Sequence, residues 1–104
     1  MSVVTPVTPV TPVRSAPPLT FATLPAPWKC ISYYESTNNL TAVNPVSGTE
    51  GAFQFAPSTW TEYAPASFPS SPLSASLSQQ LTVAEIVAGA RGFKPWETAP
   101  LCGE

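Results

Sequence analysis

The sequence predicts a small, mainly α-helical domain of several short helices with at most one short hairpin, preceded by an extended proline-rich linker. The chain has 104 residues, enough for one domain. Eleven of its fourteen prolines lie in residues 1–27 and 57–72. Without the proline-rich parts, roughly 75 residues remain, which is near the lower size limit for a stable core. Apolar residues recur at helical spacing, most clearly between residues 74 and 92. We therefore expect a linker over residues 1–27 and a folded domain over residues 28–104.

The N-terminal segment carries a short repeat. Residues 3–13 repeat the triplet Thr-Pro-Val. Proline at every third position fixes φ, removes backbone donors and favours an extended polyproline II rod. The same character continues through Pro17 and Pro18 to about Pro27. Such a segment makes no core and would serve either as a semi-rigid stalk or as a disordered tail.

The first helix is predicted over residues 27–36. Pro27 suits the first turn of a helix, because its missing N–H is not needed there. The residues that then share one side, at spacings of three or four, are Trp28, Ile31, Ser32 and Glu35. Glu35 is therefore expected at the C-terminal end of this helix, just before a polar Ser-Thr-Asn-Asn segment.

Two further helices are predicted downstream. Pro57 in a first turn begins a helix that ends near residue 63. The clearest helix is capped by Ser74 or Ser76 and closed by Gly92. Its apolar line consists of Leu77, Leu81, Ala84 and Ala88, with Val87 beside it. Residues 44–48 are turn-forming and leave room for a short hairpin.

The two cysteines, Cys30 and Cys102, bracket nearly all of the predicted domain. They could form a disulfide or remain two free buried thiols. We favour the disulfide, because the pair lies at the two ends of the domain and nowhere else. Closing a loop of about 70 residues would stabilise the fold by on the order of 4 kcal/mol. A disulfide would also indicate an oxidising, extracytoplasmic location.

Composition argues against several classes of protein. The net charge is −2 and no Lys/Arg cluster is present, so nucleic-acid binding is not expected. No apolar run is long enough to span a membrane. No signal peptide is visible in this chain, so export would use a signal trimmed away or outside it, or a route such as phage lysis. The lack of histidine removes Ser-His-Asp and Cys-His catalysis and the usual zinc sites, so neither metal nor cofactor is expected.

Acid–base chemistry has to use glutamate, tyrosine or lysine, because the chain has no aspartate either. A single glutamate at a helix end is a weak signal, but the order of the motifs around it is specific. These motifs are Trp28 before Glu35-Ser36, then Asn44-Pro45, Gly51-x-Phe53-Gln54-Phe55, Pro57-Ser58-Thr59-Trp60, Gln79-Gln80, and finally Trp96 and Cys102.

This ordered set resembles the lysozyme-like catalytic domain of the resuscitation-promoting factors, the transglycosylase-like family of cell-wall enzymes, over about residues 28–103. The resemblance implies a mainly α fold of the lysozyme-like α+β kind. It also implies that Glu35 is the general acid/base. The residues expected at the substrate are Gln54, Thr59, Asn44 and Trp60, the last of them alternatively a core aromatic.

Three positions depart from the family pattern. The family places its first cysteine immediately before the glutamate, where this chain has Tyr34. Cys30 lies one helical turn earlier on the same face, so a bridge to Cys102 stays geometrically reasonable. Ala56 replaces a carboxylate that some members carry after the Gln-Phe pair, and residues 49–50 replace an aromatic or glycine-rich loop. These changes bear on substrate contacts and catalytic rate more than on the fold.

The activity implied by the resemblance is cleavage of the β-1,4 bond between N-acetylmuramic acid and N-acetylglucosamine in bacterial peptidoglycan. Cleavage needs a proton on the leaving oxygen, and a glutamate desolvated by aromatic side chains can hold one near neutral pH. We therefore expect a raised pKa for Glu35, and the candidate aromatics are Tyr33, Tyr34 and Trp60. Glu50 is the one other carboxylate that could lie near the cleft, but we favour a solvated loop charge for it, and we expect Glu62, Glu85 and Glu97 to be solvated as well. A hydrolase normally uses two, which favours a lytic transglycosylase over a lysozyme-type hydrolase.

Two other classes stay open from the sequence. One is a non-catalytic cell-wall-binding module of the same fold, and the other is a phage virion or lysis protein that uses this domain. The expected partner is the peptidoglycan glycan strand. The protein is expected to act as a monomer, either alone or together with other cell-wall hydrolases. The expected location is secreted or associated with the cell wall.

Overall fold

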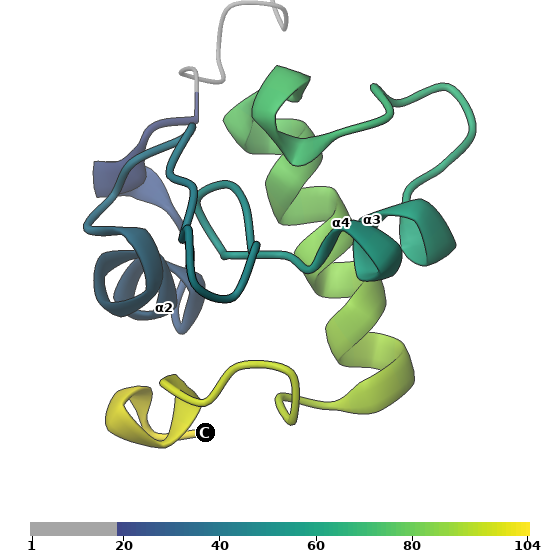
Figure 1. Cartoon of the computed structure of the whole chain (residues 1–104). Coiled ribbons are helices and arrows are strands. Elements are labelled where there is room, and N and C mark those ends of the chain that lie inside the picture. The colour runs from purple at the N-terminus through teal and green to yellow at the C-terminus, as the bar shows by residue number, and fades with distance from the viewer. Residues whose placement is uncertain (1–18) are drawn as a thin grey trace, which may run out of the picture.

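A computed structural model of the chain describes residues 19–104, which fold into three α-helices and three short 3-10 helices (Figure 1). The elements in chain order are η2 (Phe21–Thr23), α2 (Trp28–Ser36), α3 (Pro57–Tyr63), η3 (Pro72–Ser74), α4 (Leu77–Arg91) and η4 (Ala99–Cys102). Within the described residues the only β pairing consists of isolated bridges from Glu50 to Val43 and to Phe55. The mainly α, lysozyme-like fold class predicted from the sequence is confirmed, and the short hairpin is reduced to these bridges.

Helix α2 begins one residue later than predicted, because Pro27 is its N-cap. The helix buries Trp28, Ile31 and Ser32 and leaves Glu35 near its end. Thr37 ends the helix in the left-handed conformation with φ 57°, and its backbone N–H donates to carbonyls of the last turn. A β-branched residue is uncommon at such a φ, so the helix end is held by its surroundings.

The folded part of the chain begins before Trp28, the predicted domain boundary. Leu24 is buried in the core, and Leu19 and Phe21 pack against it. These apolar residues lie between prolines, and their burial places residues 19–27 on the folded domain instead of in the linker. The Thr-Pro-Val repeat and the polyproline rod predicted for it lie outside the described residues.

Helices α3 and α4 confirm the capping signals in the sequence. Pro57 occupies the first turn of α3. Ser76 is the N-cap of α4 and forms a capping box with Gln79, and Gly92 ends the helix with φ 66°. The buried residues of α4 are Gln80, Val83, Ala84 and Val87, so the core-facing side is rotated from the predicted line.

An aromatic cluster joins segments that are distant in the sequence. The ring centroids of Trp28 and Trp96 lie 5.0 Å apart, and those of Phe55 and Trp60 lie 5.3 Å apart, both edge-on. Phe53 packs against Trp28, and its backbone carbonyl accepts a 3.0 Å hydrogen bond from the Trp96 indole. The cluster therefore ties α2, the 50–55 turn and the C-terminal segment into one core.

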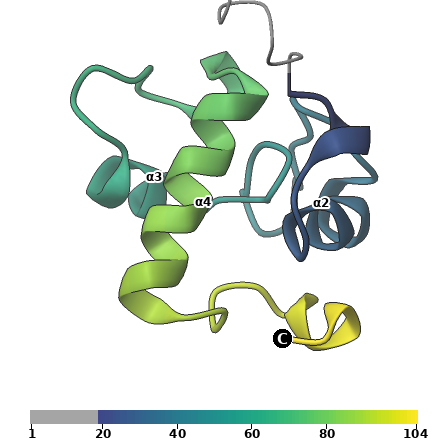
Figure 2. The same ribbon diagram turned by 180° about the vertical axis from the view of Figure 1, so that it is seen from behind.

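The C-terminal segment returns from α4 to α2, as both views show (Figures 1 and 2). The predicted disulfide is present between Cys30 of α2 and Cys102 of η4, with Cα atoms 5.8 Å apart. It spans 72 residues and fixes the end of the chain beside the helix that carries Glu35. No helix within residues 19–104 is long and apolar enough to cross a membrane.

Candidate active site

Glu35 is the candidate catalytic residue, and the structure places it at the end of α2 with its side chain half-buried. One carboxylate oxygen, Oε2, accepts a 2.7 Å hydrogen bond from the Thr98 hydroxyl. Desolvation by burial raises the pKa of Glu35 above its usual range, and the negative charge of Glu97 adds to this. Hydrogen bonds from Thr98 act in the opposite direction. The direction agrees with the sequence-based prediction of a carboxylic acid that keeps its proton to higher pH.

The polar residues around Glu35 hold the end of the helix. Ser32 is fully buried, and its hydroxyl donates to the Asn38 side chain over 2.7 Å. The Ser36 hydroxyl donates to the Ser32 carbonyl and accepts from the backbone N–H of Asn39. This network satisfies groups that a helix end would otherwise leave unpaired. The serine after Glu35 therefore fixes the backbone that aims the carboxylate.

A pocket of about 410 Å³ opens around Glu35, and we call it the Glu35 pocket. Its lining residues are Tyr34, Glu35, Asn44, Ser47, Thr49, Gln54, Pro95, Glu97 and Thr98. One wall comes from α2 and the following turn, and the other from the segment after α4. Of the aromatics predicted to desolvate Glu35, Tyr34 lines this pocket, whereas Tyr33 and Trp60 do not. Hydroxyl and amide groups dominate the lining, which suits a sugar more than an apolar ligand.

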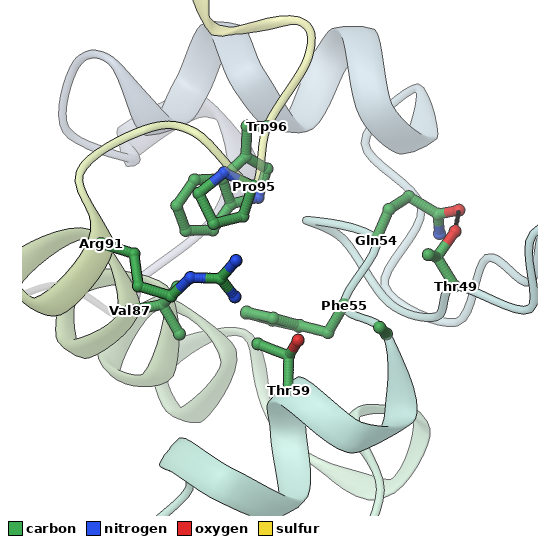
Figure 3. Close-up of a pocket in the computed structure, with 9 residues that line it drawn as sticks. Thr49, Gln54, Phe55, Thr59, Val87, Arg91, Pro95 and Trp96 are labelled. Carbon is green, nitrogen blue, oxygen red and sulfur yellow. Dashed lines mark hydrogen bonds between the residues drawn. The ribbon is translucent and has the colours of Figure 1, made fainter.

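A second pocket of about 230 Å³ adjoins the first, and we call it the Arg91 pocket (Figure 3). Its lining residues are Thr49, Gln54, Phe55, Ala56, Thr59, Val87, Arg91, Pro95 and Trp96. Thr49, Gln54 and Pro95 border both pockets. The two pockets therefore lie side by side, with Glu35 lining one and Arg91 lining the other. We refer to the pair of pockets as the groove.

Gln54 lies at the centre of the groove with most of its amide already bonded. Its side-chain N–H groups donate to the carbonyls of Gly51 (2.9 Å) and Ala42 (3.3 Å), and its carbonyl oxygen accepts from the Thr49 hydroxyl (2.8 Å). Its backbone is left-handed, with φ 53°, a costly conformation for a non-glycine residue. One acceptor lone pair remains, so Gln54 is first a structural amide and at most a single acceptor toward a ligand.

The other predicted binding residues divide between groove and core. Asn44 lines the Glu35 pocket, and its side-chain oxygen accepts the backbone N–H of Val46 over 2.9 Å. Thr59 lines the Arg91 pocket from α3. Trp60 is buried, with 1% of its surface exposed, and its indole donates to the Pro69 carbonyl. Trp60 is therefore a core residue, the alternative given for it from the sequence, because its ring is packed in the interior and is not accessible to a substrate.

Gln80 supports the groove from behind. Its side chain is fully buried, and its oxygen accepts the backbone N–H of Ala52 over 2.7 Å. Its N–H groups donate to the carbonyls of Pro72 (2.8 Å) and Leu40 (3.1 Å). Gly51 passes so close that a Cβ there would lie 2.5 Å from the Gln80 oxygen. Gln80 therefore holds α4 against the loops that carry Leu40, Ala52 and Pro72, whereas its neighbour Gln79 belongs to the capping box of α4.

The second carboxylate near Glu35 is Glu97, which the sequence analysis expected to be solvated, and not Glu50, the one candidate that it offered. Glu97 lines the Glu35 pocket and raises the pKa of Glu35. Glu50 instead accepts a hydrogen bond from Ser71 and lines neither half of the groove. Glu97 directly follows Trp96, which the motifs had singled out, and the predicted disulfide brings the end of the chain back to α2, but no sequence signal indicates that Glu97 lies beside Glu35. Among residues 19–104, no group of three or more potential ligand side chains could hold a metal ion.

Comparison with known proteins gives a consistent picture. The family model of the transglycosylase-like domain matches residues 22–99, a range that includes Glu35 and every residue lining the groove. The resuscitation-promoting factor Rpf2 of Corynebacterium glutamicum is 36% identical over 75 residues, which cover 72% of this chain and 19% of Rpf2. The probable transglycosylase SceD of Staphylococcus aureus (strain Newman) is 42% identical over 72 residues, or 68% of this chain and 31% of SceD. The chain thus spans less than a third of the length of these relatives.

Proposed function

The chain belongs to the transglycosylase-like family, and from this premise we propose that it cleaves the glycan strands of bacterial peptidoglycan. The bond is the β-1,4 linkage between N-acetylmuramic acid and N-acetylglucosamine, and Glu35 is the general acid/base. The observation that carries the proposal is the state of Glu35, which lies half-buried in a polar groove with a raised pKa. A carboxylic acid that stays protonated near neutral pH is what glycosidic cleavage requires.

In the first step Glu35 donates its proton to the glycosidic oxygen while the bond to C1 of N-acetylmuramic acid breaks. The ring passes through an oxocarbenium-like transition state, and the N-acetylglucosamine side leaves as an alcohol. The Glu35 carboxylate produced in this step keeps its 2.7 Å hydrogen bond from Thr98. Thr98 thereby stabilises the ionised form that the reaction generates.

In the second step the C6 hydroxyl of the same N-acetylmuramic acid attacks C1, and its proton goes to Glu35. The product is a 1,6-anhydro sugar, no water is consumed, and the acid is regenerated. This lytic route needs one carboxylate. The exposed side chain of Glu97 is compatible with it as a neighbour that raises the pKa of Glu35.

A lysozyme-type hydrolase is the second candidate, and Glu97 is the observation that favours it. Its place in the Glu35 pocket supplies the second carboxylate that hydrolysis normally uses. In that route Glu97 would activate a water molecule or stabilise the positive charge at C1. The two routes differ in product: lytic cleavage gives anhydro ends, and hydrolysis gives reducing ends heavier by one water.

The test is digestion of purified peptidoglycan followed by mass spectrometry of the soluble muropeptides. We expect anhydro ends from the wild type, and a loss of at least about a hundredfold in rate for Glu35→Gln. Glu50→Gln is the matched control, because it removes a glutamate outside the groove and should keep its activity. Reducing ends that disappear in Glu97→Gln would replace the lytic route with hydrolysis. Release by neither wild type nor control would leave a wall-binding module instead of an enzyme.

A folding check accompanies the Glu35 variant. Because the pKa of Glu35 is raised in the folded state, the stability contributed by its protonated form is fully present below the unfolded-state pKa and is lost as the pH rises through the folded-state pKa. Glu35→Gln avoids this loss, so it should melt at neutral pH no lower than the wild type. A variant that is inactive and also unstable would not support the catalytic role.

The cellular setting is proposed on the same basis. A single disulfide closing most of the described domain suits an oxidising, extracytoplasmic compartment. We propose that the domain acts outside the cytoplasm on the cell wall, as a monomer.

A further inference from the structure

Arg91 gives the groove a positive charge at the end remote from Glu35. Of the cationic side chains in residues 19–104, which are Lys29, Arg91 and Lys94, Arg91 alone lines either half of the groove. It occupies the last turn of α4. The Glu35 pocket carries Glu35 and Glu97. The groove is therefore acidic in one half and basic in the other.

The guanidinium of Arg91 is directed into the pocket instead of along the surface. Figure 3 shows it reaching from α4 into the space between Pro95 on one side and Phe55 and Thr59 on the other. The hydrogen bond drawn among these residues joins Thr49 to Gln54, and none is drawn to Arg91. The donors of the guanidinium are thus available to a ligand, with the Thr59 hydroxyl from α3 beside them.

We propose that Arg91 binds a carboxylate carried by an N-acetylmuramic acid residue of the glycan strand, away from the bond that Glu35 cleaves. This inference rests on the proposed function. A planar guanidinium matches a carboxylate with two parallel hydrogen bonds. N-acetylglucosamine carries no acid, whereas N-acetylmuramic acid carries a lactyl group. That group is a free carboxylate when the peptide stem is absent, and it bears the acidic groups of the stem when the stem is attached.

The opposite charges at the two ends set the placement of the strand. A carboxylate near Glu97 is disfavoured by like charge, and one near Arg91 is favoured. The acidic sugar substituents therefore select one register of the strand in the groove. Gln54 and Thr49 border both halves and lie between the bound carboxylate and the acid.

A structural role for Arg91 makes a different prediction. A cation in the last turn of a helix interacts favourably with the helix dipole, and that effect is independent of any ligand. Lys94 provides the matched control, because it is an exposed cation just past the same helix that lines neither half of the groove. Arg91→Lys keeps the charge and removes the planar fork.

The experiment measures binding in a Glu35→Gln background, so that the ligand stays intact and the result does not depend on catalysis. Three soluble ligands are titrated by calorimetry: glycan oligosaccharides with peptide stems, the same oligosaccharides with the stems removed, and chitooligosaccharides, which have no carboxylate. Arg91→Gln should weaken binding of the carboxylate-bearing ligands by roughly three- to tenfold, with a smaller effect in high salt. Binding of chitooligosaccharides should be unchanged, and Arg91→Lys should be intermediate.

The ligand arms identify the source of the carboxylate. Weakening with the stem-free strand assigns the lactyl carboxylate, and weakening with the stem-bearing strand alone assigns the peptide. Equal weakening on all three ligands, or the same weakening from Lys94→Gln, would overturn the proposal. If the wild type releases no muropeptides but Arg91→Gln still discriminates the ligands, the proposed cleavage fails and the carboxylate site stands.

Discussion

Replacing Gln80 with leucine tests how the groove is supported. The change keeps the size of the side chain and removes its polar atoms. Three short hydrogen bonds are lost: 2.7 Å from the Ala52 N–H, 2.8 Å to the Pro72 carbonyl and 3.1 Å to the Leu40 carbonyl. A fourth contact, 3.4 Å to the Ala75 carbonyl, shares the same two amide hydrogens and adds little.

The size of the expected loss in unfolding free energy follows from the backbone groups that Gln80→Leu leaves without hydrogen-bond partners. Ala52 and Pro72 are buried, and Leu40 is half-buried. Each buried group that loses its hydrogen bond costs about 1–3 kcal/mol, while the leucine regains part of this by apolar burial. The net loss of unfolding free energy should be about 3 kcal/mol. That is a large fraction of the stability of a domain this small.

The assay is equilibrium urea unfolding, with the disulfide kept oxidised and the buried tryptophans as the fluorescence probe. Gln79→Ala is the neighbouring control, because it removes only the reciprocal half of the capping box of α4 and should cost about 0.5 kcal/mol. A loss below about 1 kcal/mol for Gln80→Leu would refute the reasoning, since the backbone groups would then have found other partners.

The remaining predictions concern the acid and the disulfide. In the proposed mechanism activity requires protonated Glu35, so we expect activity to be lost as the pH rises through the pKa of Glu35. Thr98→Val removes a hydrogen bond that lowers this pKa and should move the alkaline limb of the pH–rate profile upward. Glu97→Gln removes a charge that raises the pKa and should move the limb downward, so shifts in the same direction would contradict the assignment. Reducing the disulfide should lower the unfolding free energy by about 4 kcal/mol, measurable as a lower urea midpoint with reductant than without.

The helices could be predicted from the sequence because their signals are local. Pro57, the capping box at Ser76 and Gly92 each act within one turn of chain, and the structure confirms all three. The N-terminal boundary of the folded domain could not be predicted from such local signals. Leu24 lies in a proline-rich segment that is typical of a linker, and its burial depends on α2 being there to receive it.

The residues of the candidate site also differ in whether local sequence signals could predict them. The wall formed by α2 and the following turn carries the motif residues, so Asn44 and Gln54 were expected at the groove. The opposite wall, residues 91–98, carries only Trp96 among the motif residues, and the hydrogen bond from the Trp96 indole to the Phe53 carbonyl fixes its position. The sequence therefore indicated Glu35 but not Glu97, which was expected to be solvated and which lines the Glu35 pocket because residues 91–98 fold back towards α2.

We expect the pKa of Glu35 to depend on the disulfide, because the bridge joins the two segments that meet at Glu35. Thr98 lies 63 residues from Glu35 and is the N-cap of η4, the short helix that contains Cys102. Cys30 lies on α2 five residues before Glu35, so the bridge fixes both partners of the Thr98 hydrogen bond relative to each other. With the bridge reduced, η4 can leave α2, and Glu35 then loses the hydroxyl that stabilises its ionised form together with the nearby charge of Glu97. A change in the pH profile would then accompany the loss of stability, and an unchanged profile in the reduced, still folded protein would show that the aromatic cluster alone holds the two segments together.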